Sequence, residues 1–231
     1  MLATTTATAV TTSSIPVAAA VFGWAAGSIG VGVGLPQAWR LWVDRRDEGL
    51  SLASNVFTVL FATAWVLYGV ASHRSVQVAT AAAGLAVAVA VLAGHAWLSR
   101  PPLRTWLPLW VVGTAFLLFM FSVGRGPLGL TASGATIVGV LPQLVSLVRA
   151  RRRDIHRVAG VSITRWVLSV ACNVLWFGYG VLVHDPLLIG NCLIIGTLSM
   201  SIVVLTSRSA RSERLELLDG SVAFDAAAVC A

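Results

Sequence analysis

The chain has 231 residues, of which 57% are hydrophobic and only 11% are charged. Because a soluble domain carries about a quarter charged residues, this composition excludes an ordinary soluble protein and indicates a membrane protein. All sixteen basic residues are arginines, and nearly all of them lie between apolar blocks or near the C-terminus. The net charge of +7 therefore predicts membrane topology, with the lipid bilayer as a partner and no nucleic acid.

The N-terminus and the cysteines carry few signals. Residues 1–15 contain no basic residue, so we predict a disordered N-terminus and not a cleaved signal peptide. Cys172, Cys192 and Cys230 have no regular spacing, which indicates neither a disulfide framework nor a metal site. No Ser–His pair, aspartate pair or histidine cluster is expected at one depth. We therefore expect no metal, no cofactor and no catalytic residues.

The apolar residues fall into blocks of a length that suits a membrane span. A helix rises about 1.5 Å per residue and must cross about 30 Å of hydrocarbon. We therefore predict an all-α membrane protein with seven transmembrane helices. The predicted spans are residues 16–42, 52–71, 76–98, 105–123, 128–149, 161–183 and 186–206.

The arginines predict the orientation of these spans. With the N-terminus outside, only Arg74 and Arg125 of the sixteen arginines lie on the outer side. Short loops rich in arginine stay in the cytoplasm, so this asymmetry favours an odd number of spans. We expect a multi-pass protein of the plasma or inner membrane, with its N-terminus outside and its C-terminus in the cytoplasm.

A repeat runs through the sequence. Leu-Pro-Gln at 35–37 returns at 141–143, an offset of 106, and residues 49–70 match residues 160–181 at an offset of 111 with eight identities. The second match begins with Gly-x-Ser and ends with Trp-x-x-Tyr-Gly-Val. Three spans leave the chain on the opposite side, so a fourth must precede a second unit of the same orientation. We predict parallel three-helix bundles at 16–98 and 127–206, a linker helix within 99–126 and a cytoplasmic tail at 207–231.

These motifs resemble the PQ-loop superfamily. Within it, the stretch WFGYGVLVHDPLLIGN at 176–191 is similar to SWEET sugar transporters, and the paired tryptophans resemble the half-size SemiSWEETs. The resemblance covers residues 16–206 and implies the 3+1+3 arrangement and the transport of a sugar. SWEETs are themselves an established example of parallel repeats related by an axis along the membrane normal.

The two Pro-Gln pairs predict an inner gate. Pro36 and Pro142 remove one helical hydrogen bond each, and the neighbouring amides of Gln37 and Gln143 can bond the freed carbonyl groups or reach across the bundle. Two hinges at one depth would let the inner halves swing. A static kink is the alternative. The SWEET resemblance also implies prolines in each second helix, but 51–71 and 160–183 contain none, which leaves a gate of two prolines.

A layer of polar and aromatic residues predicts a substrate site. A sugar presents apolar C–H faces and a ring of hydroxyl groups, which indole and amide groups can bind without charge. The SWEET resemblance assigns Trp176 and Asn191 to the substrate, with Trp65 and Thr80 as their repeat counterparts. Thr80 departs from the asparagine of the family. Asn173 either faces the same seam or bonds a neighbouring helix.

Other residues near this layer have structural interpretations. Asp185 before Pro186 has the pattern of a helix N-cap followed by proline at the first helical position. Tyr68 and Tyr179 are expected to be anchors at the outer rim. His184 is expected at the interface, and so is His95 near the inner end of its span.

The predicted function is transport without ion coupling. No Asp, Glu or Lys lies in the core of any span, whereas ion-coupled transporters usually hold such a residue there. We predict alternating-access uniport of a small neutral solute, a mono- or disaccharide. A PQ-loop amino-acid transporter and a membrane scaffold or sensor without transport are the alternatives. The sequence is consistent with a transporter that works as a monomer and with one that works as a homo-oligomer.

Overall fold

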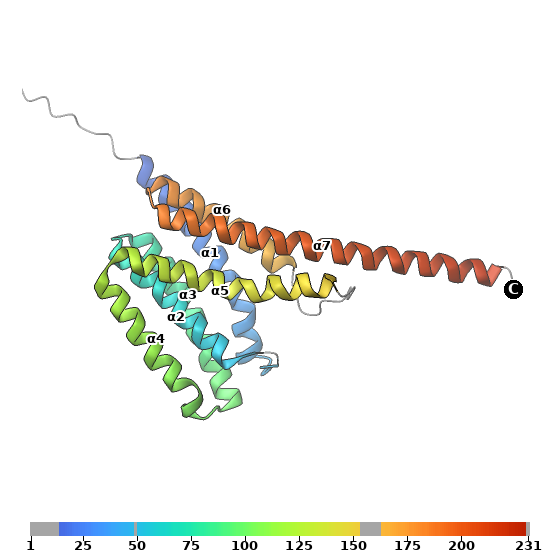
Figure 1. The fold of residues 1–231 in the computed structure, drawn as a ribbon, viewed down its shortest axis with the longest axis horizontal. Coiled ribbons are helices and arrows are strands. Elements are labelled where there is room, and N and C mark those ends of the chain that lie inside the picture. Colours follow the sequence, from blue (N-terminus) through green and yellow to red (C-terminus); the bar gives the residue numbers. More distant parts are fainter. Residues whose placement is uncertain (1–13, 49, 153–162, 230–231) are drawn as a thin grey trace, which may run out of the picture.

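The computed structural model describes residues 14–48, 50–152 and 163–229, and within these ranges it consists of seven α-helices (Figure 1). The helices are α1 (Ser14–Trp42), α2 (Leu52–Ala71), α3 (Ser75–Ser99), α4 (Leu103–Val123), α5 (Arg125–Arg152), α6 (Ile163–Leu182) and α7 (Pro186–Val229). Each of the seven contains a segment long and apolar enough to cross a membrane. The prediction of an all-α, multi-pass membrane protein is confirmed.

The ends of the helices follow the predicted spans closely except in two places. The span predicted at 128–149 is longer in the structure, where α5 covers Arg125–Arg152. The backbone of α7 stays helical to Val229, through most of the segment predicted as a cytoplasmic tail. Disorder was predicted for residues 1–15, but α1 already begins at Ser14, so the prediction is wrong for the last two of these residues. Residues 1–13 and most of the basic α5–α6 loop lie outside the described residues.

Local hydrogen bonds explain why two of the helices begin where they do. Ser51, the serine of the first Gly-x-Ser motif, caps α2 by accepting a hydrogen bond from the amide of Ser54 at 3.4 Å. Asp185 caps α7 by accepting one from the amide of Leu188 at 3.1 Å, and Pro186 occupies the first helical position. The predicted role of Asp185 as an N-cap is therefore confirmed.

The α2–α3 and α6–α7 turns have the same backbone conformation. His73 and His184 have left-handed φ angles of 54° and 53°. The next amide then bonds back to a glycine carbonyl, from Arg74 to Gly69 at 3.0 Å and from Asp185 to Gly180 at 2.9 Å. These residues are 111 apart in the sequence, the same offset as in the second part of the repeat.

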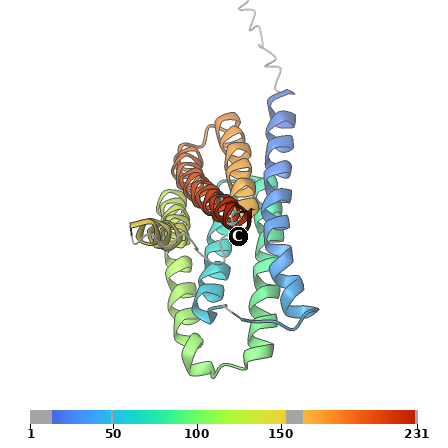
Figure 2. The same cartoon turned by 90° about the vertical axis from the view of Figure 1, so that its right-hand side faces the viewer.

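The helices also pair in the same way in the two halves. α3 packs against both α1 and α2, and α7 packs against both α5 and α6. The halves meet where α1 contacts α6 and α2 contacts α5, while α4 packs on α2 and α5. In Figures 1 and 2, α5 and α7 run at a steep angle to α2, α3 and α4. The two groups converge at the end that carries the α2–α3 and α6–α7 turns (Figure 1).

Glycines let α1 approach α3 closely. A β-carbon on Gly27 would lie 2.4 Å from the β-carbon of Thr80, and one on Gly34 would lie 2.8 Å from Val87. Both distances are too short for two carbon atoms, so only glycine fits at these positions. Small residues are typical at helix crossings in membrane proteins. In lipid the hydrophobic effect does not drive helices together, so close packing has to stabilise their association.

We expect Gly27→Ala to destabilise the protein. The added methyl group would force α1 away from α3, at an overpacking cost of about 1–3 kcal/mol. The measurement is the thermal unfolding midpoint of the purified protein in detergent. Gly84→Ala is the matched control, because a β-carbon there would meet nothing within 4 Å. An unchanged midpoint for Gly27→Ala would contradict the close packing.

Candidate functional site

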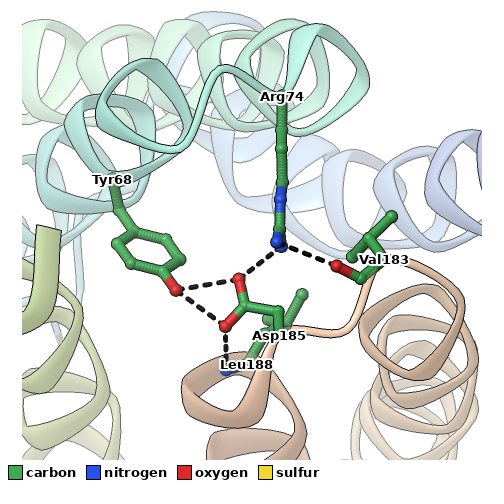
Figure 3. Close-up of polar contacts among 5 residues, drawn as sticks. All are labelled: Tyr68, Arg74, Val183, Asp185 and Leu188. Carbon is green, nitrogen blue, oxygen red and sulfur yellow. Dashed lines mark hydrogen bonds and ion pairs between the residues drawn. The ribbon is translucent and has the colours of Figure 1, made fainter.

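A cluster of polar residues joins the two halves at the end that carries the α2–α3 and α6–α7 turns (Figure 3). Asp185 is only 3% exposed, and it forms an ion pair with Arg74. The hydroxyl group of Tyr68 donates to the Asp185 carboxylate, with both oxygens at 2.8 Å. Arg74 also donates to the carbonyl of Val183 at 3.1 Å. We call Tyr68, Arg74 and Asp185 the closing cluster.

Because Asp185 is buried, it needs all its bonding partners in the closing cluster at the same time. A carboxylate removed from water is costly unless charge and hydrogen bonds compensate it. Here the Arg74 guanidinium, the Tyr68 hydroxyl and the Leu188 amide all compensate Asp185. The first two come from the other half of the chain, so Asp185 is fully paired only while the two halves touch at this end.

Sequence reasoning missed the role of Arg74. The signal was present, because the offset of 111 that aligns 49–70 with 160–181 continues to His73 and His184 and then to Arg74 and Asp185. Arg74 and Asp185 hold equivalent positions in the two matching stretches, carry opposite charges and form the ion pair. Tyr68 was predicted to be only an anchor at the rim, and the structure gives it a buried hydrogen bond to the other half of the chain.

Two aromatic pairs lie directly beneath the closing cluster. Trp65 meets Tyr68 edge to face at 5.7 Å and 88°, and Trp176 meets Tyr179 in the same way at 5.3 Å and 87°. Such T-shaped pairs hold both rings in fixed orientations. The tryptophans are therefore fixed by the same tyrosines that pack at the closed end.

Each of these tyrosines packs on the first helix of the other half. A β-carbon on Gly129 of α5 would lie 2.7 Å from the Tyr68 ring, and one on Gly23 of α1 would lie 3.1 Å from the Tyr179 ring. Each half therefore packs one tyrosine ring on a glycine of the other half. Both glycines are needed at this end, because any larger side chain would keep the tyrosine ring from packing against the helix.

The structure brings two of the five predicted substrate residues together and buries a third. Trp65 and Trp176 both pack against one apolar cluster that includes Tyr179 and Cys192. Asn191, next to Cys192, is 8% exposed, and its side-chain oxygen has no hydrogen-bond partner among the described residues. An unpaired buried amide oxygen is costly, which marks Asn191 as a group that awaits a ligand or a water molecule.

The other two predicted residues use their polar groups within their own helices. The Thr80 hydroxyl donates to the carbonyl of Val76 at 2.8 Å, and its β-carbon faces Gly27. Asn173 donates to the carbonyl of Ser169 at 2.8 Å, and its β-carbon faces Gly196 of α7. Both side chains are thus bonded within their own helices, and neither forms a hydrogen bond to a residue of the tryptophan layer.

The predicted hinge residues lie at matching positions toward the other end of the bundle. α1 and α5 both continue through their prolines, and Pro36 and Pro142 are exposed on the helix surface. Gln37 and Gln143 are half-buried, and within the described ranges neither amide has a hydrogen-bond partner. The bonds that the sequence suggested for these amides are therefore not formed in this conformation.

Beyond Pro36, the end of α1 is fixed to α3. The Trp42 indole donates to the carbonyl of Ala90 at 2.9 Å and stacks on Trp97 at 5.9 Å, and Arg45 lies over the Trp97 ring at 4.0 Å. A cation over an indole adds to the stacking energy.

One prediction near this end of the molecule is wrong. His95, expected at the interface, is 5% exposed, and its Nδ1 pairs with the Asn55 amide nitrogen at 2.8 Å. The hydrogen bond links α2 to α3, so it satisfies both polar side chains inside the bundle and explains why the histidine can be buried. Among the described residues, no three His, Cys, Asp or Glu side chains gather in a way that could hold a metal ion.

Comparison with solved structures identifies the fold. A eukaryotic SWEET transporter, solved at 3.7 Å resolution, matches with a TM-score of 0.67 over 84% of this chain and 99% of that chain, at 14% sequence identity. The chain has the SWEET fold. No protein-family model matches the sequence, and no curated protein matches it either.

In this SWEET fold, we expect Asp185→Asn to open the closed end. Asparagine is also a good N-cap, so α7 keeps its start, but the ion pair with Arg74 is lost. Hydrogen bonds to charged groups are worth about 1.5–3 kcal/mol, so the open form should gain about tenfold or more in population. The measurement is the rate at which a membrane-impermeant maleimide labels Cys192, with Cys172 and Cys230 replaced by alanine.

Two comparisons sharpen this labelling experiment. Tyr68→Phe should also raise the rate, by a smaller factor, because it removes the hydroxyl group but leaves the ion pair. Asp44→Asn, at an exposed site in the α1–α2 connection, serves as the control for a simple change of charge. If Cys192 reacts at the same slow rate in all four proteins, the closing cluster does not control this end.

Proposed function

We propose that this chain is a uniporter that carries a small neutral solute, a mono- or disaccharide, by alternating access. The observation that carries the proposal is the order of layers along the bundle. A charged closing cluster seals one end, and directly beneath it lie two fixed indoles and the unpaired buried amide of Asn191. The likeness to a protein described as a SWEET transporter supports a sugar as the solute.

The chemistry of this layer suits a sugar. Trp65 and Trp176 offer flat faces to apolar C–H groups, and the Asn191 amide can donate and accept hydrogen bonds. The apolar cluster around the tryptophans consists of aliphatic, aromatic and thiol side chains. A charged solute would find no counter-charge there, so neutral molecules are favoured over amino acids.

Alternating access requires that the two ends open in turn. α5 and α7 converge with α2, α3 and α4 at the end that carries the α2–α3 and α6–α7 turns, and the two groups diverge toward the other end (Figure 1). We assign the closing cluster to the outside and the arginine-rich connections to the cytoplasm of a cell membrane. In this assignment the structure is inward-facing. Residues 16–98 and 127–206 act as parallel repeats that rock about the layer of the tryptophans, with α4 as the linker.

We expect Trp176→Ala and Asn191→Ala to lower sugar uptake at least tenfold. Each removes a contact with the solute from the proposed layer, by loss of an aromatic wall or of hydrogen bonds. The measurement is uptake of labelled sugars and amino acids into proteoliposomes. Trp24→Ala is the control, because Trp24 is 52% exposed on the surface of α1. Equal uptake by all variants would refute the site, and no flux of any solute in the wild type would favour a scaffold or sensor.

Transport should not depend on a pH gradient. Ion-coupled transporters usually hold an ionisable residue inside the membrane, whereas Asp185 lies at the start of α7 and is paired with Arg74. In liposomes with the same sugar gradient, uptake should therefore be equal with and without an imposed proton gradient. Sugar accumulation driven by the proton gradient would contradict uncoupled transport.

A further inference from the structure

The first and third helices of each half contact each other in the same register near the closed end. A β-carbon on Gly23 would lie 2.6 Å from Val76, and one on Gly129 would lie 2.8 Å from Leu187. Gly129 follows Gly23 by 106 residues and Leu187 follows Val76 by 111, the two offsets of the sequence repeat. The register found in the sequence is thus the register of the packing at this level.

The same register holds near the other end. Leu41 lies against Gly94, where a β-carbon would be 3.1 Å from its own. Their counterparts at the same two offsets, Leu147 and Leu205, belong to one apolar cluster of α5, α6 and α7. Equivalent positions of the two halves therefore lie close together at both levels of the helices.

The middle contact differs between the halves. In the first half it is the pair Gly27 and Thr80, in which the threonine side chain lies directly on the glycine. The offsets of 106 and 111 make Ser133 of α5 and Asn191 of α7 the equivalent pair in the second half. In the first half, the threonine methyl group fills the contact against a glycine. In the second half, two residues with polar side chains take these places.

Both polar residues of the second half lack a partner. The Ser133 hydroxyl oxygen and the Asn191 amide oxygen are buried, and neither has a hydrogen bond within the part of the chain that the structure describes. Asn191 is more than nine-tenths buried, at 8% exposure. Both side chains come from helices that pack against each other, α5 and α7. Two buried oxygens with no partner among the described residues therefore hold equivalent places to a contact that is filled in the first half.

We propose that Ser133 and Asn191 form a two-point hydrogen-bonding subsite for adjacent hydroxyl groups of the solute. The hydroxyl of Ser133 can donate or accept, and the amide oxygen of Asn191 accepts, so a diol edge satisfies both. Thr80 and Gly27 close the equivalent place in the first half, so this pair of solute hydroxyl groups is bound from the second half, while the indoles of both halves pack on the apolar faces. Ser133 is then a determinant of which sugar hydroxyls are required. This inference rests on the proposed function.

The test compares protein variants with sugar analogues. Uptake into proteoliposomes is measured for D-glucose and its 2-, 3-, 4- and 6-deoxy analogues, or for the same series built on another sugar that the uptake panel identifies. Loss of one neutral hydrogen bond lowers transport efficiency roughly two- to tenfold. We expect the wild type to lose this factor with at least one analogue. For Ser133→Ala, the transport efficiency of the full sugar should fall by the same factor. The transport efficiency of that analogue should not fall any further.

Controls separate recognition from folding. Ser133→Thr keeps the hydroxyl group and should restore the requirement for the missing sugar hydroxyl. If Ser133→Ala does not fold, Ser133→Cys provides the same comparison with a much weaker hydrogen-bonding group. Thr131→Ala is the control on the same helix, because that hydroxyl already bonds the carbonyl of Pro127 at 2.9 Å.

The possible results distinguish the two proposals. An equal factor for Ser133→Ala across every analogue, or no effect at all, would overturn the subsite while the transport of sugar stands. A folded wild type that carries no sugar would overturn the proposed function and the subsite with it.

Discussion

The ion pair of Arg74 and Asp185 is the constraint on which the closed end depends. The two residues hold equivalent places in the repeat, so they meet only if the halves run parallel and in register. Asp185 is buried to 3% exposure, a state that an isolated carboxylate cannot hold. When the halves part, both charges return to water, where they need no partner. Water therefore replaces the cluster at little net cost, which makes the closure reversible.

Much of the fold could be predicted from the sequence, because spans and repeats are properties of local pattern. Apolar blocks gave the seven helices, and the Asp185 and Pro186 pattern gave the start of α7. The partners of polar groups could not be predicted in this way. His95 is buried because Asn55, forty residues away, faces it across two helices. Arg74 is similar, because its partner lies 111 residues later in the chain.

The two halves share most of their packing contacts but differ in a few polar side chains at equivalent positions. Tyrosines on glycines, aromatic pairs and histidine turns recur almost contact for contact. The exceptions are Arg74 opposite Asp185, and Thr80 where the second half has Asn191. The shared contacts give both halves the same frame, whereas the unlike groups Arg74 and Asp185 supply an attraction between the halves.

In the transport cycle proposed above, the contacts of the closed end must be weak enough for solute binding to open them. An edge-to-face aromatic pair is worth about 0.5–1.5 kcal/mol, and a buried ion pair roughly breaks even against its desolvation. A ligand shifts a conformational equilibrium only by its difference in affinity for the two states. A neutral sugar held by two indoles and a few hydrogen bonds provides a few kcal/mol in total. The contacts that seal this end therefore lie in the range that solute binding can overcome, as the proposed uncoupled carrier requires.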